Sequence, residues 1–152
     1  MNTYENITHE IVSRLYITVE PFLRQKKGSC ADYLINDSYC LEVKLDFSAA
    51  NTGNIFIETA TKNGNKVTES GVALSAKYDY SMLYLIPLAE KFYSCFEIEA
   101  KKLVYLAKKF GRRTQTRPRV NGNFPGFFGI GYILKIEILK ENAHGQSELT
   151  LG

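Results

Sequence analysis

The chain lacks long apolar runs and any regular cysteine pattern, and both absences narrow the class of protein it can be. No apolar stretch reaches the roughly 18–20 residues that a membrane-spanning helix requires, so we expect no membrane partner. The first residues include no basic leader followed by an apolar stretch, and we therefore expect no secretion signal. Cys30, Cys40 and Cys95 show no CxxC or Cys/His spacing, which argues against a structural zinc site. Reduced cysteines of this kind are typical of an intracellular protein, and we expect a cytoplasmic location.

Motifs for nucleotide binding and for covalent catalysis are also missing. The glycine-rich stretch at 126–131 contains neither GxGxxG nor a Walker lysine. The two histidines, His9 and His144, are far apart in the sequence, and no serine or cysteine has an evident basic partner. The sequence therefore gives no support for a dinucleotide-binding protein, a P-loop protein or a serine or cysteine hydrolase.

Positive charge is concentrated in one part of the chain. Residues 101–119 include eight basic and no acidic side chains, so the rest of the chain has 11 basic residues (19 less 8) against 16 acidic ones. Such a segment can bind the phosphates of a nucleic acid, or it can be a solvated helix face followed by a loop. The candidate phosphate contacts are Lys101, Lys108, Lys109, Arg112, Arg113, Arg117 and Arg119.

The apolar pattern predicts one domain in which helices and strands alternate. A length of 152 residues with 45% hydrophobic residues is enough for one apolar core. We expect an α/β fold with a central mixed β-sheet flanked by helices, in one domain over residues 1–141, and a flexible tail over residues 142–152. The expected helices are 3–20 and 97–110, the expected strands are 30–35, 39–47, 54–60, 81–86 and 132–139, and residues 72–80 remain ambiguous.

The second expected strand has charged residues alternating with apolar ones. Glu42 and Lys44 lie on one face of such a strand, and Asp32 lies on the strand before it. Two carboxylates and the Val43 carbonyl oxygen can bind Mg²⁺ or Mn²⁺, which prefer oxygen ligands. Lys44 would then orient or deprotonate a water, or contact a phosphate, which is the chemistry of metal-dependent phosphodiester hydrolysis. The same residue types also suit a solvated ion pair on an exposed strand face.

Three further residues are candidates for such a site. Glu10, on the expected first helix, is a candidate metal or water ligand. Glu58, on the third expected strand, is a candidate acidic residue that faces inward. Lys77 can reach a phosphate, or it can be a solvated surface lysine.

The order and spacing of these residues extend beyond the strand pair. Asp32 is followed after nine residues by Glu42-Val43-Lys44, and Glu10 precedes both on a helix. This order resembles the PD-(D/E)XK nuclease superfamily, in particular its archaeal-type Holliday junction resolvases and related small phage nucleases. The resemblance covers roughly residues 10–86, and Ala31 stands where the name of the superfamily has proline. Further stretches similar to small phage-encoded members are EVKLD at 42–46, TGNIFIE at 52–58, SG at 70–71 and KYDY at 77–80.

The resemblance implies a restriction-endonuclease-like core and a Mg²⁺- or Mn²⁺-dependent endonuclease that hydrolyses DNA. Branched DNA such as a Holliday junction is a candidate substrate, and a homodimer is expected because small nucleases of this kind often pair. Asp32 and Glu42 would be the metal ligands, and Lys44 would be the catalytic lysine. Two alternatives remain open: a non-catalytic nucleic-acid-binding module, and a phage interaction or structural protein in which the charge cluster is incidental.

Overall fold

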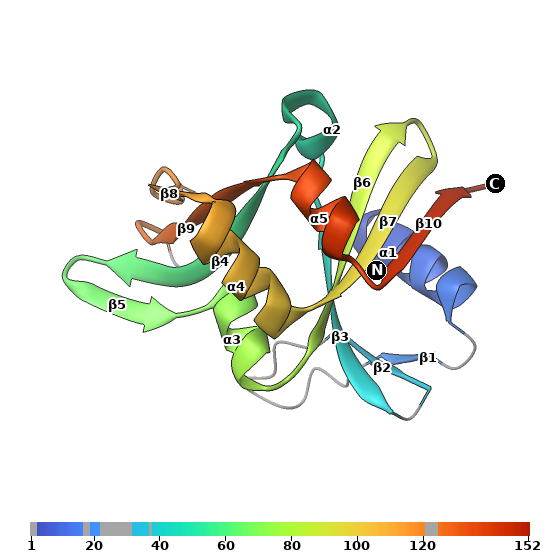
Figure 1. Cartoon of the computed structure of the whole chain (residues 1–152), viewed down its shortest axis with the longest axis horizontal. Helices are drawn as coiled ribbons and strands as arrows, with labels where there is room; N and C mark the ends of the chain where they lie inside the picture. Colours follow the sequence, from blue (N-terminus) through green and yellow to red (C-terminus); the bar gives the residue numbers. More distant parts are fainter. Residues whose placement is uncertain (1–2, 17–18, 22–31, 37, 121–124) are drawn as a thin grey trace.

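The computed structural model describes residues 3–16, 19–21, 32–36, 38–120 and 125–152. It contains a large mixed sheet and a smaller antiparallel sheet, with helices beside them (Figure 1). The large sheet has the strand order β1-β2-β3-β6-β7-β10, in which β3 and β6 are parallel and all other neighbours are antiparallel. Its strands are β1 Val19–Pro21, β2 Tyr33–Ile35, β3 Tyr39–Leu45, β6 Ser81–Ala89, β7 Phe92–Glu99 and β10 Gly145–Thr150.

The small sheet includes a hairpin in which a long strand, β4, is joined to β5 by a turn that contains a glycine. β4 and β5 form a hairpin whose turn is Gly64 and Asn65, and Gly64 has a φ of +61° that suits glycine in a tight turn. The order of the small sheet is β5-β4-β9-β8, and every pair in it is antiparallel. Its strands are β4 Asn54–Asn63, β5 Lys66–Glu69, β8 Arg112–Gln115 and β9 Phe128–Lys135.

Two apolar clusters cover the two faces of the large sheet. Leu41 and Val43 of β3 point to one face, where they pack with Ile11 and Val12 of the first helix, as the alternation in β3 predicts. Tyr84 of β6 points to the other face, which the small sheet and the remaining helices cover. The helices are α1 Thr3–Leu15, α2 Ala49–Thr52, α3 Gly71–Lys77, α4 Ala100–Phe110 and α5 Ile136–Asn142. Glu42 and Lys44 therefore lie on the face opposite to α1.

The α/β fold with a mixed sheet and flanking helices is confirmed, but several expected elements have other limits. The helix expected over 97–110 begins at Ala100, because Phe92–Glu99 forms β7, which pairs along both of its edges with β6 and β10. The last expected strand ends at Lys135, where α5 begins. Residues 72–80, which were ambiguous, contain most of α3.

The segment expected to be a flexible tail contains a strand at the edge of the large sheet. β10 pairs with β7 through six residues, and Leu151 after it is buried. The polar sequence of β10 gives little apolar alternation, because an edge strand exposes most of its side chains. In the described part of the chain, no helix has the length and apolar composition needed to span a membrane.

Candidate active site

The site forms where strand β3 lacks a neighbouring strand along one edge. β2 pairs with β3 only from Tyr39 to Leu41, and the next polar groups of that edge bond to side chains instead. Asp32 lies just before β2, and its carboxylate oxygen Oδ2 accepts a hydrogen bond of 2.8 Å from the Val43 N–H. The Leu45 N–H donates to the hydroxyl oxygen of Tyr4 at 3.4 Å. The short β2 therefore leaves an edge at which a carboxylate and a phenol replace a strand.

The carboxyl groups of Asp32 and Glu42 are neighbours at this edge. Burial raises the pKa of Glu42 from 4.5 to about 8, and the charge of Asp32 adds to this effect, whereas Lys44 opposes it. A hydrogen bond between the two carboxyl groups also raises the pKa of Glu42. Oε2 of Glu42 is buried and has no hydrogen-bond partner among the described residues. A buried carboxyl oxygen without a partner is costly, and a cation would satisfy it.

The backbone of β3 adds one more oxygen to this arrangement. In a strand, the N–H and the C=O of one residue point to the same side, so the Val43 carbonyl shares the edge at which its N–H bonds to Asp32. Among the described residues, no group of three His, Cys, Asp or Glu side chains is placed to hold a metal. Mg²⁺ is commonly held by one or two carboxylates together with waters and phosphate oxygens. Asp32, Glu42 and the Val43 carbonyl therefore fit a magnesium site that is open to solvent or substrate.

Lys44 lies beside this pair and next to a buried tyrosine. Its Cα is paired with that of Tyr84 in the parallel β3–β6 ladder, so the two side chains share one face of the sheet. Burial raises the pKa of the Tyr84 hydroxyl, and the negative charges of nearby carboxylates raise it further. These carboxylates are Asp46, Glu42 and Glu58. Lys44 is therefore a positively charged residue on a face of the sheet where three carboxylates raise the pKa of Tyr84.

Asp46 matches the resemblance but has a structural role. One of its carboxylate oxygens accepts hydrogen bonds from the Ser48 N–H at 3.0 Å, the Ser48 hydroxyl at 2.9 Å and the Ala49 N–H at 3.0 Å. These donors lie at the start of the short helix α2. The carboxylate therefore satisfies N–H groups that would otherwise have no partner inside the helix.

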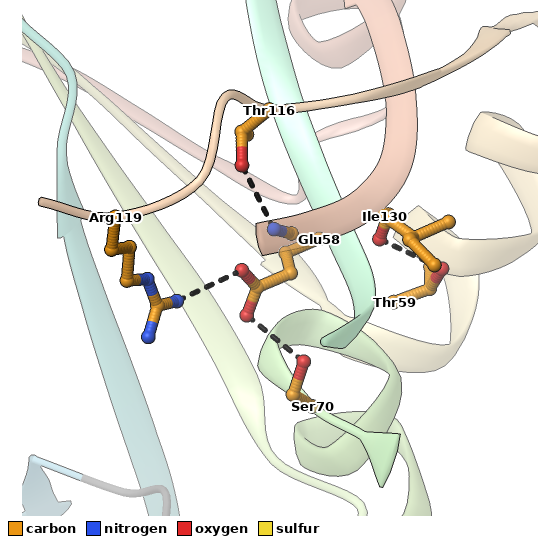
Figure 2. A network of polar contacts seen from close by, with 7 residues as sticks. Glu58, Thr59, Ser70, Thr116, Arg119 and Ile130 are labelled. Atoms are coloured by element: carbon orange, nitrogen blue, oxygen red, sulfur yellow. Dashed lines mark hydrogen bonds and ion pairs between the residues drawn. The ribbon is translucent and has the colours of Figure 1, made fainter. Parts of the chain in front are cut away.

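Glu58 lies on β4 of the small sheet. Its Oε2 accepts a hydrogen bond of 3.0 Å from the Ser70 hydroxyl, and its Oε1 lies 3.6 Å from Nη2 of Arg119 (Figure 2). Glu42 belongs to the large sheet and Glu58 to the small sheet, and the charges of both raise the pKa of the Tyr84 hydroxyl. This placement agrees with the expectation that Glu58 faces inward. The direct partners of its carboxylate are Ser70 and Arg119.

The structure does not bring Glu10 or Lys77 to the carboxyl pair. Glu10 forms an ion pair of 2.9 Å with Arg14 on α1. Burial raises the pKa of Tyr93 on β7, and the charge of Glu10 adds to this effect, on the face of the sheet opposite to Glu42. Lys77 is exposed at the end of α3, whereas Ser70, which contacts Glu58, lies at the start of that helix.

Other residues of α1 lie nearer to the site, and the sequence did not indicate them. The charges of Asp32 and Glu5 both raise the pKa of Tyr33, after the larger effect of burial. Tyr4 contacts the backbone of β3 directly. A helical period of apolar residues identifies α1, but it does not show which polar residue of the helix lies at which strand edge.

The basic residues of 101–119 are distributed over two regions. Lys101 forms an ion pair with Asp79, and Lys109 lies 5.6 Å from the ring centre of Tyr105 on the exposed side of α4. Arg112 pairs with Ile133 and Arg113 with Tyr132, so these arginines lie on opposite faces of the small sheet. Lys108 and Arg117 are exposed. The lysines of α4 therefore lie in a different region from Arg119, which pairs with Glu58.

Comparisons of this chain with protein-family models, with curated proteins and with solved structures found no match.

Proposed function

We propose that this chain is a metal-dependent endonuclease of the PD-(D/E)XK type that hydrolyses phosphodiester bonds in DNA. The supporting observation is the contact between the Asp32 and Glu42 carboxyl groups beside Lys44, with Oε2 of Glu42 buried and without a partner among the described residues. A buried carboxyl group whose pKa a neighbouring carboxylate raises costs stability, and groups of this kind are concentrated at functional sites, where a bound cation would offset the cost.

The topology around these residues supports the restriction-endonuclease-like core that the resemblance implies. The antiparallel pair β2–β3 follows Asp32 and contains Glu42 and Lys44, and β6 then runs parallel to β3 after α3. Helix α1 covers one face of this unit, and α4 lies on the other (Figure 1). A mixed sheet with helices on both faces is consistent with such a core, and the short β2 leaves the edge of β3 beyond Leu41 without a strand partner in the large sheet.

The chemistry follows from the charges of these groups. Asp32, Glu42 and the Val43 carbonyl would hold Mg²⁺ or Mn²⁺, which, when bound, makes water more acidic and neutralises charge on the phosphate. Lys44 supplies a positive charge that orients the attacking water or binds a phosphate oxygen. The buried Tyr84 hydroxyl stays protonated, because its pKa is raised, and it can therefore act as a donor to the neighbouring carboxylates.

DNA is the proposed partner because segment 101–119 has eight basic residues and no acidic one, and Lys108 and Arg117 of this segment are exposed. Branched DNA and a homodimer belong to the same proposal, since two copies of the site would cut two strands. The buried Cys95 is a free thiol, which suits a protein that acts inside the cell.

The proposal is tested by incubating the purified protein with labelled duplex, single-stranded and four-way-junction DNA in Mg²⁺, Mn²⁺ or EDTA. We expect cleavage in Mg²⁺ or Mn²⁺ and none in EDTA. Glu42→Gln and Lys44→Ala should each lower the cleavage rate by about 10²–10⁴-fold, the range for a positioned acid–base group. The matched controls are Glu69→Gln and Lys66→Ala, which change exposed residues on β5. DNA binding without cleavage would favour the non-catalytic module, and neither binding nor cleavage would favour the interaction or structural protein.

A further inference from the structure

The Glu58 carboxylate lies in a slot between two glycines that have no space for a side chain. Gly71 has a φ of +58°, and a Cβ atom there would lie 2.7 Å from the Glu58 carbonyl oxygen and 3.0 Å from Oε2. A Cβ atom on Gly129 would lie 2.7 Å from Oε1 of Glu58. At Gly71 a side chain would collide with the backbone of Glu58, so only glycine leaves room there, and the Ser70 hydroxyl donates to Oε2. The two glycines therefore allow the chain to pass close to this carboxylate, and Ser70 and Arg119 are its polar partners.

Arg119 reaches Glu58 from an extended segment, residues 112–120, which we call the basic arm. The Thr116 N–H donates to the Gly129 carbonyl at 2.8 Å, and the Gly126 N–H donates to the Arg119 carbonyl at 2.8 Å. The Thr116 hydroxyl also accepts a bond of 2.8 Å from the Gly129 N–H (Figure 2). These bonds hold the basic arm beside β9 and beyond its end. Four arginines and no acidic residue belong to it, namely Arg112, Arg113, Arg117 and Arg119.

The ion pair with Glu58 leaves most of the Arg119 guanidinium available. The contact joins one nitrogen, Nη2, to Oε1, whereas a guanidinium has five N–H donors in a planar fork. The Arg119 side chain is 38% exposed, so these donors are not enclosed by protein. A guanidinium of this kind matches the oxygen geometry of a phosphate, which can accept two parallel hydrogen bonds.

The two candidate cations belong to different sheets. Lys44 shares a face of β3 with Glu42 in the large sheet, whereas Arg119 pairs with Glu58 of the small sheet. The pair of Glu58 and Arg119 is therefore distinct from the carboxyl pair of Asp32 and Glu42.

We propose that Glu58 and Arg119 form a phosphate-positioning pair, in which Glu58 orients the Arg119 guanidinium so that its remaining N–H groups bind a backbone phosphate of DNA. An arginine that is already oriented loses less side-chain freedom on binding, which favours a defined position of the phosphate. Glu58 is then a positioning residue for Arg119 and not a third metal ligand. The inference rests on the proposed function for the identity of the ligand.

The phosphate site is tested by DNA binding in EDTA, which needs no catalysis. Fluorescence anisotropy of a labelled duplex would be measured over a series of salt concentrations for the wild type and for Arg119→Ala, Arg119→Lys and Arg117→Ala. Loss of one phosphate contact should reduce the slope of log affinity against log salt by about 0.9, and we expect this for Arg119→Ala. Arg119→Lys should keep the slope because it keeps the charge. Thermal melting of each variant would confirm that it is folded.

Arg117→Ala is the matched control, because it removes the same charge from the same arm at an exposed residue. We expect it to lower the duplex affinity and the single-turnover cleavage rate less than Arg119→Ala does, because Arg117 has no carboxylate that orients it among the contacts of the described residues. Equal effects of the two variants on binding and cleavage would overturn the proposal, because they would show only the general charge of the arm. A wild-type protein that binds no DNA would overturn it as well.

The role of Glu58 is tested by single-turnover cleavage at saturating DNA. Arg119→Ala should lower this rate by about 10²-fold or more, as for the loss of one donor to the reacting phosphate. Arg119→Lys should recover only part of the rate, because it lacks the fork. Glu58→Gln should also lower the rate, and the double variant should be little worse than Arg119→Ala alone. Tighter DNA binding and an unchanged rate in Glu58→Gln would contradict the positioning role. A wild type that binds without cutting would overturn the nuclease proposal, whereas the salt slope would still decide the phosphate site.

Discussion

Glu42 has a buried carboxyl group whose ionisation should control the stability of the metal-free protein. Its pKa is about 8 in the folded protein against an ordinary value of 4.5. A raised pKa means that the fold favours the protonated carboxyl, so the effect on stability is absent below about pH 4.5. The unfolded chain ionises first as the pH rises, and the folded protein loses stability until about pH 8. Each unit of pKa corresponds to about 1.4 kcal/mol, so the total is several kcal/mol.

We therefore predict that the free energy of unfolding in EDTA falls between pH 5.5 and pH 8.5, more steeply in the wild type than in Glu42→Gln. The variant has no carboxyl at this position, so this component of the pH dependence should disappear. Urea denaturation at a series of pH values measures the difference directly. Parallel pH profiles for the two proteins would contradict the burial of an ionisable Glu42. Glu69→Gln, at an exposed position, should follow the wild type.

At the residue scale, the sequence predicted the strand face of the site but not its other contacts. The alternation of Glu42 and Lys44 with apolar residues predicts a shared face, because side chains alternate in any strand. The sequence also predicted Asp32 on the preceding strand as a partner of Glu42, and its carboxylate does lie beside Glu42. Tyr4 and Tyr84 were missed, since tertiary packing brings them to the site from a distant helix and an apolar strand. Neither residue has a local pattern that distinguishes it from core or surface tyrosines.

Among the structural elements, the pair β4–β9 depends on one close backbone contact at Gly131. A Cβ atom on this residue would lie 2.0 Å from the Ile57 carbonyl oxygen, which belongs to a strand backbone that cannot move independently. We predict that Gly131→Ala destabilises the protein by about 1–3 kcal/mol, as for overpacking elsewhere. The melting temperature should fall by roughly 3–10 °C for a chain of this size. Differential scanning calorimetry gives this value.

Gly152→Ala is the control for that measurement, because no atom lies within 4 Å of a Cβ built there. It should melt at the temperature of the wild type. A Gly131→Ala variant that also melts with the wild type would show that β4 and β9 lie farther apart than described.

Strand β10 provides a second test at this scale, because the sequence suggested a tail in its place. It pairs with six residues of β7, and His144 before it lies 2.6 Å from the buried carboxylate of Glu97 through its Nε2 atom. We predict that a chain ending at Ala143 loses several kcal/mol of stability, since each backbone hydrogen bond contributes about 1 kcal/mol. Thermal melting of the truncated chain measures the loss. An unchanged melting temperature would show that residues 144–152 do not pack on β7.

The element boundaries that the sequence missed have a common physical reason. Glu97 and Glu99 suggested the start of a helix, because acidic residues favour helix N-termini. In the structure Glu97 lies in β7, where the Tyr16 and Tyr39 hydroxyls donate to its Oε1. Tyr16 directly follows α1 and Tyr39 belongs to β3, so tertiary contacts decide the conformation of the segment. Local propensity could not show this.

At the scale of the whole molecule, the candidate groups come from both sheets. Glu42 and Lys44 belong to the large sheet, whereas Glu58 belongs to the small sheet and Arg119 to the arm beside it. The sequence predicted one central sheet and therefore could not show that a second sheet brings Arg119 to an acidic residue. It did predict the uneven charge, because charge along the chain requires no knowledge of the fold.

The proposed nuclease depends on a single divalent-cation site formed by Asp32 and Glu42. Calorimetric titration of the protein with Mn²⁺ at pH 8 tests this most directly, with Glu42→Gln and the exposed control Glu69→Gln measured beside the wild type. We predict one site in the wild type and in Glu69→Gln, with protons released on binding because Glu42 is partly protonated at this pH. Glu42→Gln should bind Mn²⁺ at least about tenfold more weakly. Equal Mn²⁺ binding by all three proteins, or no binding by the wild type, would contradict the metal site.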